Sequence, residues 1–394
     1  MRIGIDLLYL IPGVVGGGET YACCLLHGLA EIDPRNEYFI FVNRSAASWP
    51  IPNQENFHRV VCPISGVNRA ARYAWEQFAL PVQLRSQAID LCHAMGNVSP
   101  LLAPCPTVVT IHDVNYVGLR EFMPARRRRT LRFFSRQAAR RAQRIITVSH
   151  FSQGEIVRYM HIDSERISVI HEGPGWVQNG RLGDLDALRL RYKLPEHYVV
   201  AFTGGGIPHK NVDRLISAFE IAREGLPHRL LLIGNVSPFL SRRIHASRAV
   251  QALGYVPNED IHGLLRCSDL FVLASSYEGF GLPVVEAQRA GSPVACSQIG
   301  ALLEVAADAA AYFDPHSIDD IVSVVRSILT APGRRDELIN SGRTNSYRFS
   351  WRRTAEETLR VYERVASSAR GAAGRSSYSS EPPRKACAAG DPLP

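Results

Sequence analysis

Two glutamates stand eight residues apart around a short glycine-containing segment, SSYEGFGLPVVEAQRA (residues 275–290). Glu278 lies in a predicted loop after the apolar strand 270–273, and Glu286 lies about one turn inside the predicted helix 283–290. Carboxylates accept hydrogen bonds from hydroxyls, and the unpaired amides at a helix N-terminus favour phosphate. The segment therefore predicts a site for a sugar linked to a nucleoside diphosphate. The plainer alternative is a strand, a turn and a helix with a capping glutamate.

A second glycine-rich turn, TGGGIPHKN (residues 203–211), combines permissive glycines at Gly205 and Gly206 with the charge of Lys210. It fails the P-loop pattern because asparagine follows Lys210 and no glycine precedes it. It also fails the dinucleotide pattern because His209 occupies the last glycine position. Its amide donors and lysine still favour phosphate binding, with a surface lysine at a helix start as the alternative.

The first half of the chain offers further polar residues at the ends of apolar runs. His112 and Asp113 follow the predicted strand 108–111, where an imidazole can donate to a substrate hydroxyl or to a backbone carbonyl. A structural histidine is equally compatible with this position. Ser149 follows another predicted strand, and Gly16, Gly17 and Gly18 form a glycine turn near the start of the chain.

The spacing of Glu278 and Glu286 around GFGLP resembles the signature of the family 4 retaining glycosyltransferases of the GT-B fold. The resemblance implies that Glu278 faces the transferred sugar and that Glu286 binds the ribose hydroxyls of the donor. It also implies that backbone amides between the two glutamates bind the donor; the candidate residues are Gly279, Phe280, Gly281 and Leu282.

Other segments resemble the same family. The second glycine-rich turn is similar to its G-x-x-x-P-R-K-N segment, which implies that Lys210 contacts the donor diphosphate. His209 and the glycines stand where this family often has arginines, so diphosphate binding is either weaker or aided by an arginine from elsewhere. The family commonly carries His-Asp after the corresponding strand, which implies sugar binding by His112 and, less directly, Asp113. Gly16–Gly18 resembles its glycine loop beside the donor phosphates and the acceptor.

The strands and helices that could position these residues are indicated by a pattern that repeats along the chain. Apolar runs alternate with amphipathic stretches, the pattern pauses between about residues 173 and 196, and it then restarts. This predicts an α/β protein of two facing, doubly wound Rossmann-like domains. We expect an acceptor-side domain over 1–175, a nucleotide-sugar-binding domain over 176–348, a closing helix over 349–366 that returns to the first domain, and a disordered tail over 367–394.

Composition limits the other possibilities. With 46% hydrophobic and 21% charged residues in 394, the chain can bury two to three domain cores. No run reaches the roughly 18 apolar residues of a membrane span. The eight cysteines lack metal-site spacing, so we expect reduced thiols, a cytoplasmic location and no metal or other cofactor.

A net charge of +8 favours an anionic partner. Arginines recur at helical spacing from Arg126 to Arg144, which predicts a basic amphipathic helix. Peripheral contact with the inner face of the cytoplasmic membrane and a solvated or acceptor-binding face are both compatible with it. Nucleic acid is not expected because no recognition motif accompanies the charge.

The family resemblance, with these features, implies a retaining, metal-independent hexosyltransferase that uses a nucleotide sugar, and the similarity to bacterial polysaccharide enzymes makes GDP-mannose the first candidate. Its acceptor would be a glycan or lipid-linked glycan in exopolysaccharide or lipopolysaccharide biosynthesis. His112, Glu278 and Lys210 are the expected catalytic residues. Two alternatives stay open: a nucleotide-sugar epimerase on the same fold, and a catalytically silent protein that binds sugar nucleotides.

Overall fold

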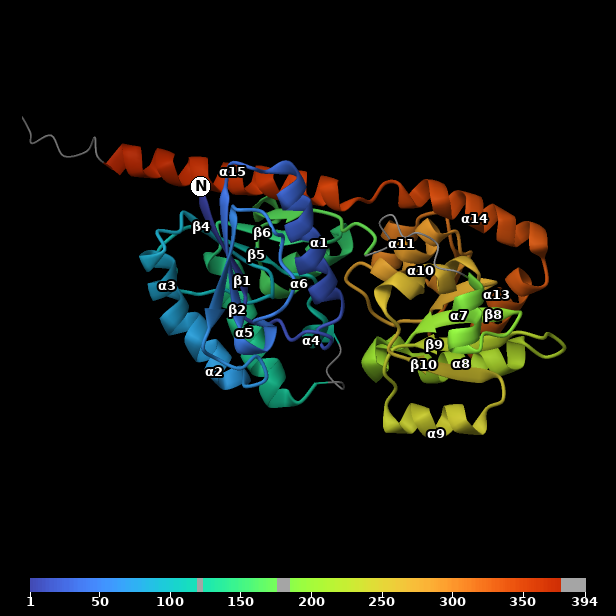
Figure 1. Cartoon of the computed structure of the whole chain (residues 1–394). Coiled ribbons are helices and arrows are strands. Elements are labelled where there is room, and N and C mark those ends of the chain that lie inside the picture. The colour runs from blue at the N-terminus through green and yellow to red at the C-terminus, as the bar shows by residue number, and fades with distance from the viewer. Residues whose placement is uncertain (119–122, 176–184, 377–394) are drawn as a thin grey trace, which may run out of the picture.

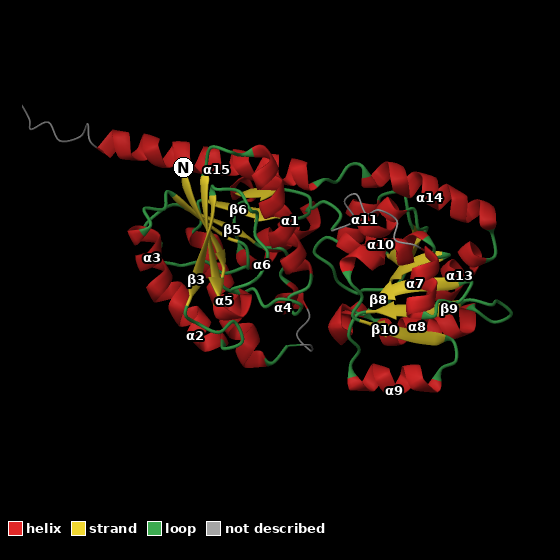
Figure 2. Ribbon diagram, in the orientation of Figure 1, coloured by secondary structure: helices red, strands yellow, loops and turns green. Residues whose placement is uncertain are grey.

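The computed structural model describes residues 1–118, 123–175 and 185–376, and it contains two parallel β-sheets (Figures 1 and 2). The first sheet has seven strands in the order β3-β2-β1-β4-β5-β6-β7. Its strands are β1 (Arg2–Leu7), β2 (Glu37–Asn43), β3 (Phe57–Cys62), β4 (Leu91–Ala94), β5 (Thr107–Thr110), β6 (Arg144–Thr147) and β7 (Ile167–Val169).

The second sheet has six strands in the order β10-β9-β8-β11-β12-β13, again with parallel neighbours. Its strands are β8 (Tyr198–Phe202), β9 (Arg229–Ile233), β10 (Val250–Gly254), β11 (Leu270–Leu273), β12 (Val294–Ser297) and β13 (Ala311–Phe313). In both sheets the strand order reverses beside the first strand, which creates a switch point where loops diverge to opposite faces.

Helices cover both faces of each sheet, as the side-chain alternation of the strands requires. On one face of the first sheet, α1 (Gly17–Ile32) and α15 (Trp351–Ser376) share a core with β1. Most of the remaining helices of the described residues connect successive strands, whereas α13 and α14 follow the last strand. They are α2 (Arg69–Ala74), α3 (Leu80–Ser86), α4 (Asn115–Gly118), α5 (Ala125–Arg141), α6 (His150–Met160), α7 (Leu185–Tyr192), α8 (Val212–Ala222), α9 (Pro238–Ala246), α10 (Asn258–Arg266), α11 (Leu282–Ala290), α12 (Gly300–Ala306), α13 (Ile318–Leu329) and α14 (Pro332–Ser346).

The long helix α15 returns from the second sheet to the first, where it packs against α1, and Figure 1 shows it crossing the top of the first half of the molecule. Its first residue, Trp351, is buried and donates from Nε1 to the Pro174 carbonyl oxygen at 2.7 Å. Tyr362 is also buried and forms a 2.6 Å hydrogen bond with Nδ1 of His93 on β4. These contacts hold the end of the second half of the chain against the first sheet.

The two-sheet architecture confirms the expected fold class, and several local expectations need correction. Helix α1 begins at Gly17, so Gly17 and Gly18 are its first turn and Gly16 is its cap, instead of a loop. The basic helix α5 ends at Arg141, and Arg144 begins β6, because the chain must enter the sheet there.

The region around residues 69–86 is not one continuous α-helix. It consists of α2, a π-helical turn (Trp75–Ala79) and α3. The closing helix continues to Ser376, beyond the expected end at 366, and residues 377–394 of the expected tail lie outside the described residues. Among the helices of the described ranges, none is long and apolar enough to cross a membrane.

Candidate active site

The carboxyl ends of the two sheets meet at a seam, where the loop after β11 touches the loops after β5 and β6. The Gly279 carbonyl oxygen accepts a hydrogen bond from Ser149 Oγ at 2.6 Å and lies 3.0 Å from Ser152 Oγ. Ser149 also caps α6 by accepting from the Ser152 amide at 3.0 Å. The Ser149 hydroxyl is fully buried and engaged within the protein. It joins the two sheets at the edge where ligands of such folds bind.

Six ionisable side chains follow one another across this seam, each within electrostatic reach of the next. Lys210 and Glu278 come from the second sheet, Asp113, His112 and Glu172 from the first, and Glu286 from α11. We call this set the charged row: Lys210, Glu278, Asp113, His112, Glu172 and Glu286. The expected site residues from distant parts of the sequence are therefore brought together at one edge.

At one end of the charged row, Lys210 Nζ lies 2.7 Å from Glu278 Oε1. The two side chains are only 19% and 11% exposed, so this is a charge-assisted hydrogen bond in a partly desolvated place. Glu278 follows β11, and Lys210 ends the short turn Pro208–Lys210 before α8. Because an ammonium has three donors, Lys210 can hold the carboxylate and a phosphate oxygen at the same time.

The glycine turn beside Lys210 takes a shape that favours glycine. Gly204, Gly205 and Gly206 have φ angles of 56°, 73° and 76°. The Ser276 amide donates to the His209 carbonyl oxygen at 2.8 Å, which connects this turn to the loop that carries Glu278. Burial lowers the pKa of His209 and Lys210 lowers it further, although Glu278 opposes them. His209 is thus a neutral imidazole near pH 7, and it does not replace the charge of the arginine expected from the family pattern.

His112 lies at the centre of the charged row. Its Nδ1 is 3.5 Å from Glu172 Oε1, its Nε2 is 3.2 Å from the Met95 carbonyl oxygen, and Tyr21 meets its ring edge-on at 4.6 Å between centroids. Burial by itself would lower the pKa of His112. The hydrogen bond and charge of Glu172, with Asp113 and the Met95 carbonyl, outweigh burial and raise the pKa. The surroundings therefore favour an imidazolium that can donate to an anionic or hydroxyl group.

Asp113 lies between His112 and Glu278, and its Oδ1 accepts from the Asn115 amide at 3.1 Å. Burial raises the pKa of this carboxyl, the Asn115 amide and His112 lower it, and Glu278 raises it again, with a net increase. Its own loop thus fixes its orientation, and proximity to another carboxylate opposes its ionisation.

The opposite end of the charged row joins α11 to the segment after β7. Glu286 Oε1 accepts from the Gly175 amide at 3.1 Å, and a Cβ at Gly175 would lie 2.3 Å from the same oxygen. Only glycine permits this approach. Burial raises the pKa of Glu286 to about 7, with the Gly175 amide opposing and the Glu172 charge adding to the increase. The free protein therefore holds Glu286 close to its midpoint of ionisation at neutral pH.

Two helix N-termini face the same seam. Gly281 caps α11 with a φ of 103°, and Leu282 begins the helix. A Cβ on Gly17, in the first turn of α1, would lie 3.9 Å from Leu282, so the two helix starts are neighbours. The side chain of Phe280 packs instead in the core, against His171 and Phe349. The free amides at both helix starts suit an anion such as phosphate.

Sequence reasoning missed Glu172, which is 4% exposed and is the acidic partner of His112. The signal was its position two residues after the apolar run 167–170, because parallel strands present polar side chains to ligands at their carboxyl ends. Tyr21 was also missed. It is fully buried, and its hydroxyl lies 3.1 Å from Thr110 Oγ1 on β5, which places its ring against His112.

As a whole, the seam combines acceptors for hydroxyls with donors for phosphate. Four carboxyl groups lie along the charged row, while Lys210, His112 and the helix amides supply positive charge. Within the described residues, the recorded cluster with metal-ligand geometry is His197, His228 and Asp269, and it shares no member with the charged row.

Comparison with protein families matches two models to successive parts of the chain. Residues 15–173 match the model described as Glycosyltransferase Family 4, and residues 189–345 match the model described as Glycosyl transferases group 1. The first matched segment contains His112 and Glu172, and the second contains Lys210, Glu278 and Glu286.

Individual relatives agree with the family models. The chain is 29% identical to O-antigen chain mannosyltransferase B of Escherichia coli, over 65% of this chain and 70% of that protein. It is also 29% identical to the serotype-specific mannosyltransferase WbdA of the same species, over 57% of this chain but only 29% of that longer protein. Among solved structures, sucrose-phosphate synthase of Thermosynechococcus elongatus superposes with a TM-score of 0.77 at 18% identity, covering 93% of this chain and 100% of that one.

Proposed function

The chain belongs to the family 4 glycosyltransferases of the GT-B fold, which transfer a sugar from a nucleotide sugar, and we propose that it is a retaining, metal-independent hexosyltransferase. The observation that carries this proposal is the charged row. In it, carboxylates that can accept hydrogen bonds from sugar hydroxyls lie beside positively charged groups that can donate to phosphate. The first sheet and its helices would receive the acceptor, and the second would hold the donor.

On the donor side, we assign the ribose hydroxyls to Glu286 and the diphosphate to Lys210 and the amides at the start of α11. Glu278 and the amides of residues 279–282 would hold the hydroxyls of the transferred sugar. The 2.7 Å contact between Lys210 and Glu278 supports this assignment. One ammonium group can bind the acid that contacts the sugar and, at the same time, the diphosphate that leaves. Negative charge that develops on the departing diphosphate would meet preorganised donors.

On the acceptor side, we assign His112 to the transferred sugar and the reacting centre. Glu172 holds the imidazole through Nδ1 and favours its charged form, so the ring can donate toward the charge that develops during transfer. The family resemblance implies attack from the face of the leaving group, assisted by that group. Gly16–Gly18, at the start of α1, would line the phosphate and acceptor space.

Mannose is the first candidate for the transferred hexose, and GDP-mannose for the donor, because the relatives named above are mannosyltransferases. The O-antigen relative supports a glycan or lipid-linked glycan acceptor in polysaccharide biosynthesis.

A panel of nucleoside diphosphates and their sugars tests this proposal by thermal shift and by transfer to lipid-linked glycans. We expect a preference for guanosine over uridine nucleotides and a glycan product. Release of free epimerised nucleotide sugar would favour the epimerase, and binding without turnover would favour the silent protein.

We also propose that α5 and its neighbours contact an anionic membrane surface, where a lipid-linked acceptor would be presented. Exposed arginines lie on α5, and Phe133 (55%) is exposed on the same helix. Further exposed apolar side chains lie on the segments 69–86 and 101–102, namely Phe78 (73%), Val82 (67%) and Leu102 (67%). Stacking of Tyr73 on Phe134 and a hydrogen bond from Arg141 to the Leu101 carbonyl hold these segments together. Apolar side chains rimmed by basic ones are typical of interfacial binding.

Vesicle sedimentation tests this contact. The wild-type chain should bind vesicles with phosphatidylglycerol and not those of phosphatidylcholine alone. Phe78→Ser with Phe133→Ser should weaken binding at least tenfold, whereas Tyr255→Ser, at an equally exposed aromatic on the second sheet's side, should leave it unchanged. Equal binding by the two variants would remove the proposed surface.

A further inference from the structure

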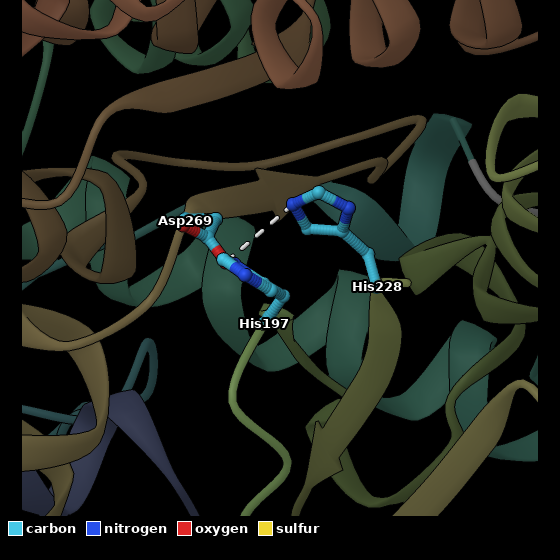
Figure 3. Close-up of side chains that lie close together, drawn as sticks. All are labelled: His197, His228 and Asp269. Carbon is cyan, nitrogen blue, oxygen red and sulfur yellow. Dashed lines mark hydrogen bonds and ion pairs between the residues drawn. The ribbon is translucent and has the colours of Figure 1, made fainter. Parts of the chain in front are cut away.

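A second cluster of chemistry-bearing side chains lies at the amino edge of the second sheet, opposite the charged row. His197, His228 and Asp269 immediately precede β8, β9 and β11, respectively. Strands of four or five residues place this edge roughly 15 Å from the carboxyl edge. Figure 3 shows the three side chains converging on one point. This cluster has no part in the transfer reaction proposed above.

The distances within the cluster fit a tetrahedral metal ion. His197 Nδ1 lies 3.3 Å and His228 Nε2 lies 3.5 Å from Asp269 Oδ2, and the three atoms are within 4.8 Å of one another. Zinc bonds to imidazole nitrogen and carboxylate oxygen are about 2.0–2.2 Å, so ligand atoms on a tetrahedral zinc stand roughly 3.3–3.6 Å apart. Two of the three distances between these ligand atoms therefore already match a tetrahedral zinc site.

His228 is poorly explained by hydrogen bonding alone. Its side chain is only 7% exposed, yet Nε2 lies at the outer limit for a hydrogen bond to Asp269, and Nδ1 has no partner in the described residues. Buried polar atoms are normally satisfied.

A supporting shell holds the carboxylate. Arg335 of α14 donates to Asp269 Oδ1 at 2.7 Å, which leaves Oδ2 directed at the two imidazoles. The Tyr198 amide also donates to Oδ2, at 3.0 Å. Such hydrogen bonds to the ligands orient them and are common around metal sites.

We propose that His197, His228 and Asp269 bind one Zn²⁺, with a water molecule in the fourth position. Two imidazoles and one carboxylate at tetrahedral spacing favour zinc over the oxygen-preferring Mg²⁺ and Ca²⁺. The ion joins three loops at the amino edge and, through Arg335, fixes α14, which leads to the returning helix α15. Its role is structural, so it is compatible with a transfer reaction that uses no metal.

The test uses the untagged full-length chain, stripped with EDTA, dialysed and titrated with Zn²⁺ alone. We expect one zinc per chain by elemental analysis. At a hundredfold excess over the dissociation constant, the Tm should rise by about 3 °C for a chain of 394 residues that unfolds as one unit. Co²⁺ should give the visible absorption of a tetrahedral ion, and Mg²⁺ should produce no shift.

Two variants and a control decide the assignment. His197→Ala removes a ligand whose side chain is 42% exposed, so the fold should survive, and it should weaken zinc binding at least a hundredfold. His228→Gln should do the same. His245→Ala, at an exposed histidine of α9, should bind zinc like the wild type. No Tm shift in the wild type, or unchanged zinc binding by His197→Ala, would overturn the proposal and leave a hydrogen-bonded His–Asp–Arg network.

Discussion

Glu286 should make donor binding depend on pH through its own ionisation. Burial raises its pKa to about 7, the Gly175 amide acts in the opposite direction, and the Glu172 charge adds to the increase. Ribose hydroxyls donate hydrogen bonds that an ionised carboxylate accepts on both oxygens, whereas a protonated carboxyl has one acceptor oxygen fewer. Binding of a nucleotide sugar should therefore select the ionised form and release a proton.

The magnitude follows from the pKa of about 7. About one eleventh of Glu286 is ionised at pH 6 and about ten elevenths at pH 8, so the Kd should be about tenfold weaker at pH 6. Calorimetry with a nucleotide sugar is the appropriate assay, because its diphosphate diester does not titrate in this range. Glu286→Gln should bind weakly at both pH values and lose the tenfold difference.

Glu286 should also make the stability of the donor-free protein depend on pH. A pKa raised from 4.5 to about 7 means that the folded state retains a proton that the unfolded state releases. The contribution to stability is present below pH 4.5 and is lost as pH rises through 7. Glu286→Gln should therefore gain up to about 3 kcal/mol relative to wild type at pH 8, and little at pH 4.5.

Glu337→Gln, at an exposed glutamate of α14, is the matched control and should follow the wild type in both experiments. A wild-type Kd that is constant between pH 6 and 8 would refute the linkage. A Glu286→Gln variant whose Kd still changes tenfold between pH 6 and pH 8 would also refute it, because another group would then control binding.

Further predictions concern the rest of the charged row and the absence of a metal requirement. Lys210→Ala should leave Glu278 partly buried without its cation and lower stability by about 1–3 kcal/mol, while the double variant with Glu278→Gln should recover most of that loss in thermal denaturation. Glu172→Gln should lower the pKa of His112, measured by NMR titration of its imidazole, and His112→Ala should reduce kcat about a hundredfold or more with an unchanged fold. Transfer should continue in EDTA, and a strict need for Mn²⁺ or Mg²⁺ would contradict the metal-independent scheme.

Much of the fold could be predicted because buried parallel strands are short apolar runs with clear limits. The runs at 229–233 and 270–273 coincide with β9 and β11. Strands β10 and β13 escaped prediction because they lie at sheet edges, where exposed positions interrupt the apolar pattern. Gly17 and Gly18 were expected in a turn and not in α1 because glycines are poor helix formers, although their amides are well suited to the first turn of the helix.

Part of the site was predictable, because several of its residues follow apolar runs that the sequence identifies as strands. His112, Glu278 and Lys210 each follow an apolar run in the sequence, and the structure brings them to one seam. The pairing of these residues was not predictable, because Glu172 contacts His112 across 60 residues that only the sheet order brings together. The cluster of His197, His228 and Asp269 was hidden for the same reason, since its members belong to three separate strands.

The crowding of carboxyl groups at the seam suggests how the free site is prepared for its donor. Glu286 and Asp113 both have raised pKa values, in part because neighbouring carboxylates oppose their ionisation. A ligand rich in hydroxyls relieves this repulsion by donating hydrogen bonds to the ionised acids, while its diphosphate is matched by Lys210 and the start of α11. We infer that the repulsion among these carboxylates, which destabilises the free protein, is relieved when the donor binds. A nucleotide sugar, which carries both kinds of group on one molecule, should therefore bind more tightly than either the nucleoside diphosphate or the free sugar.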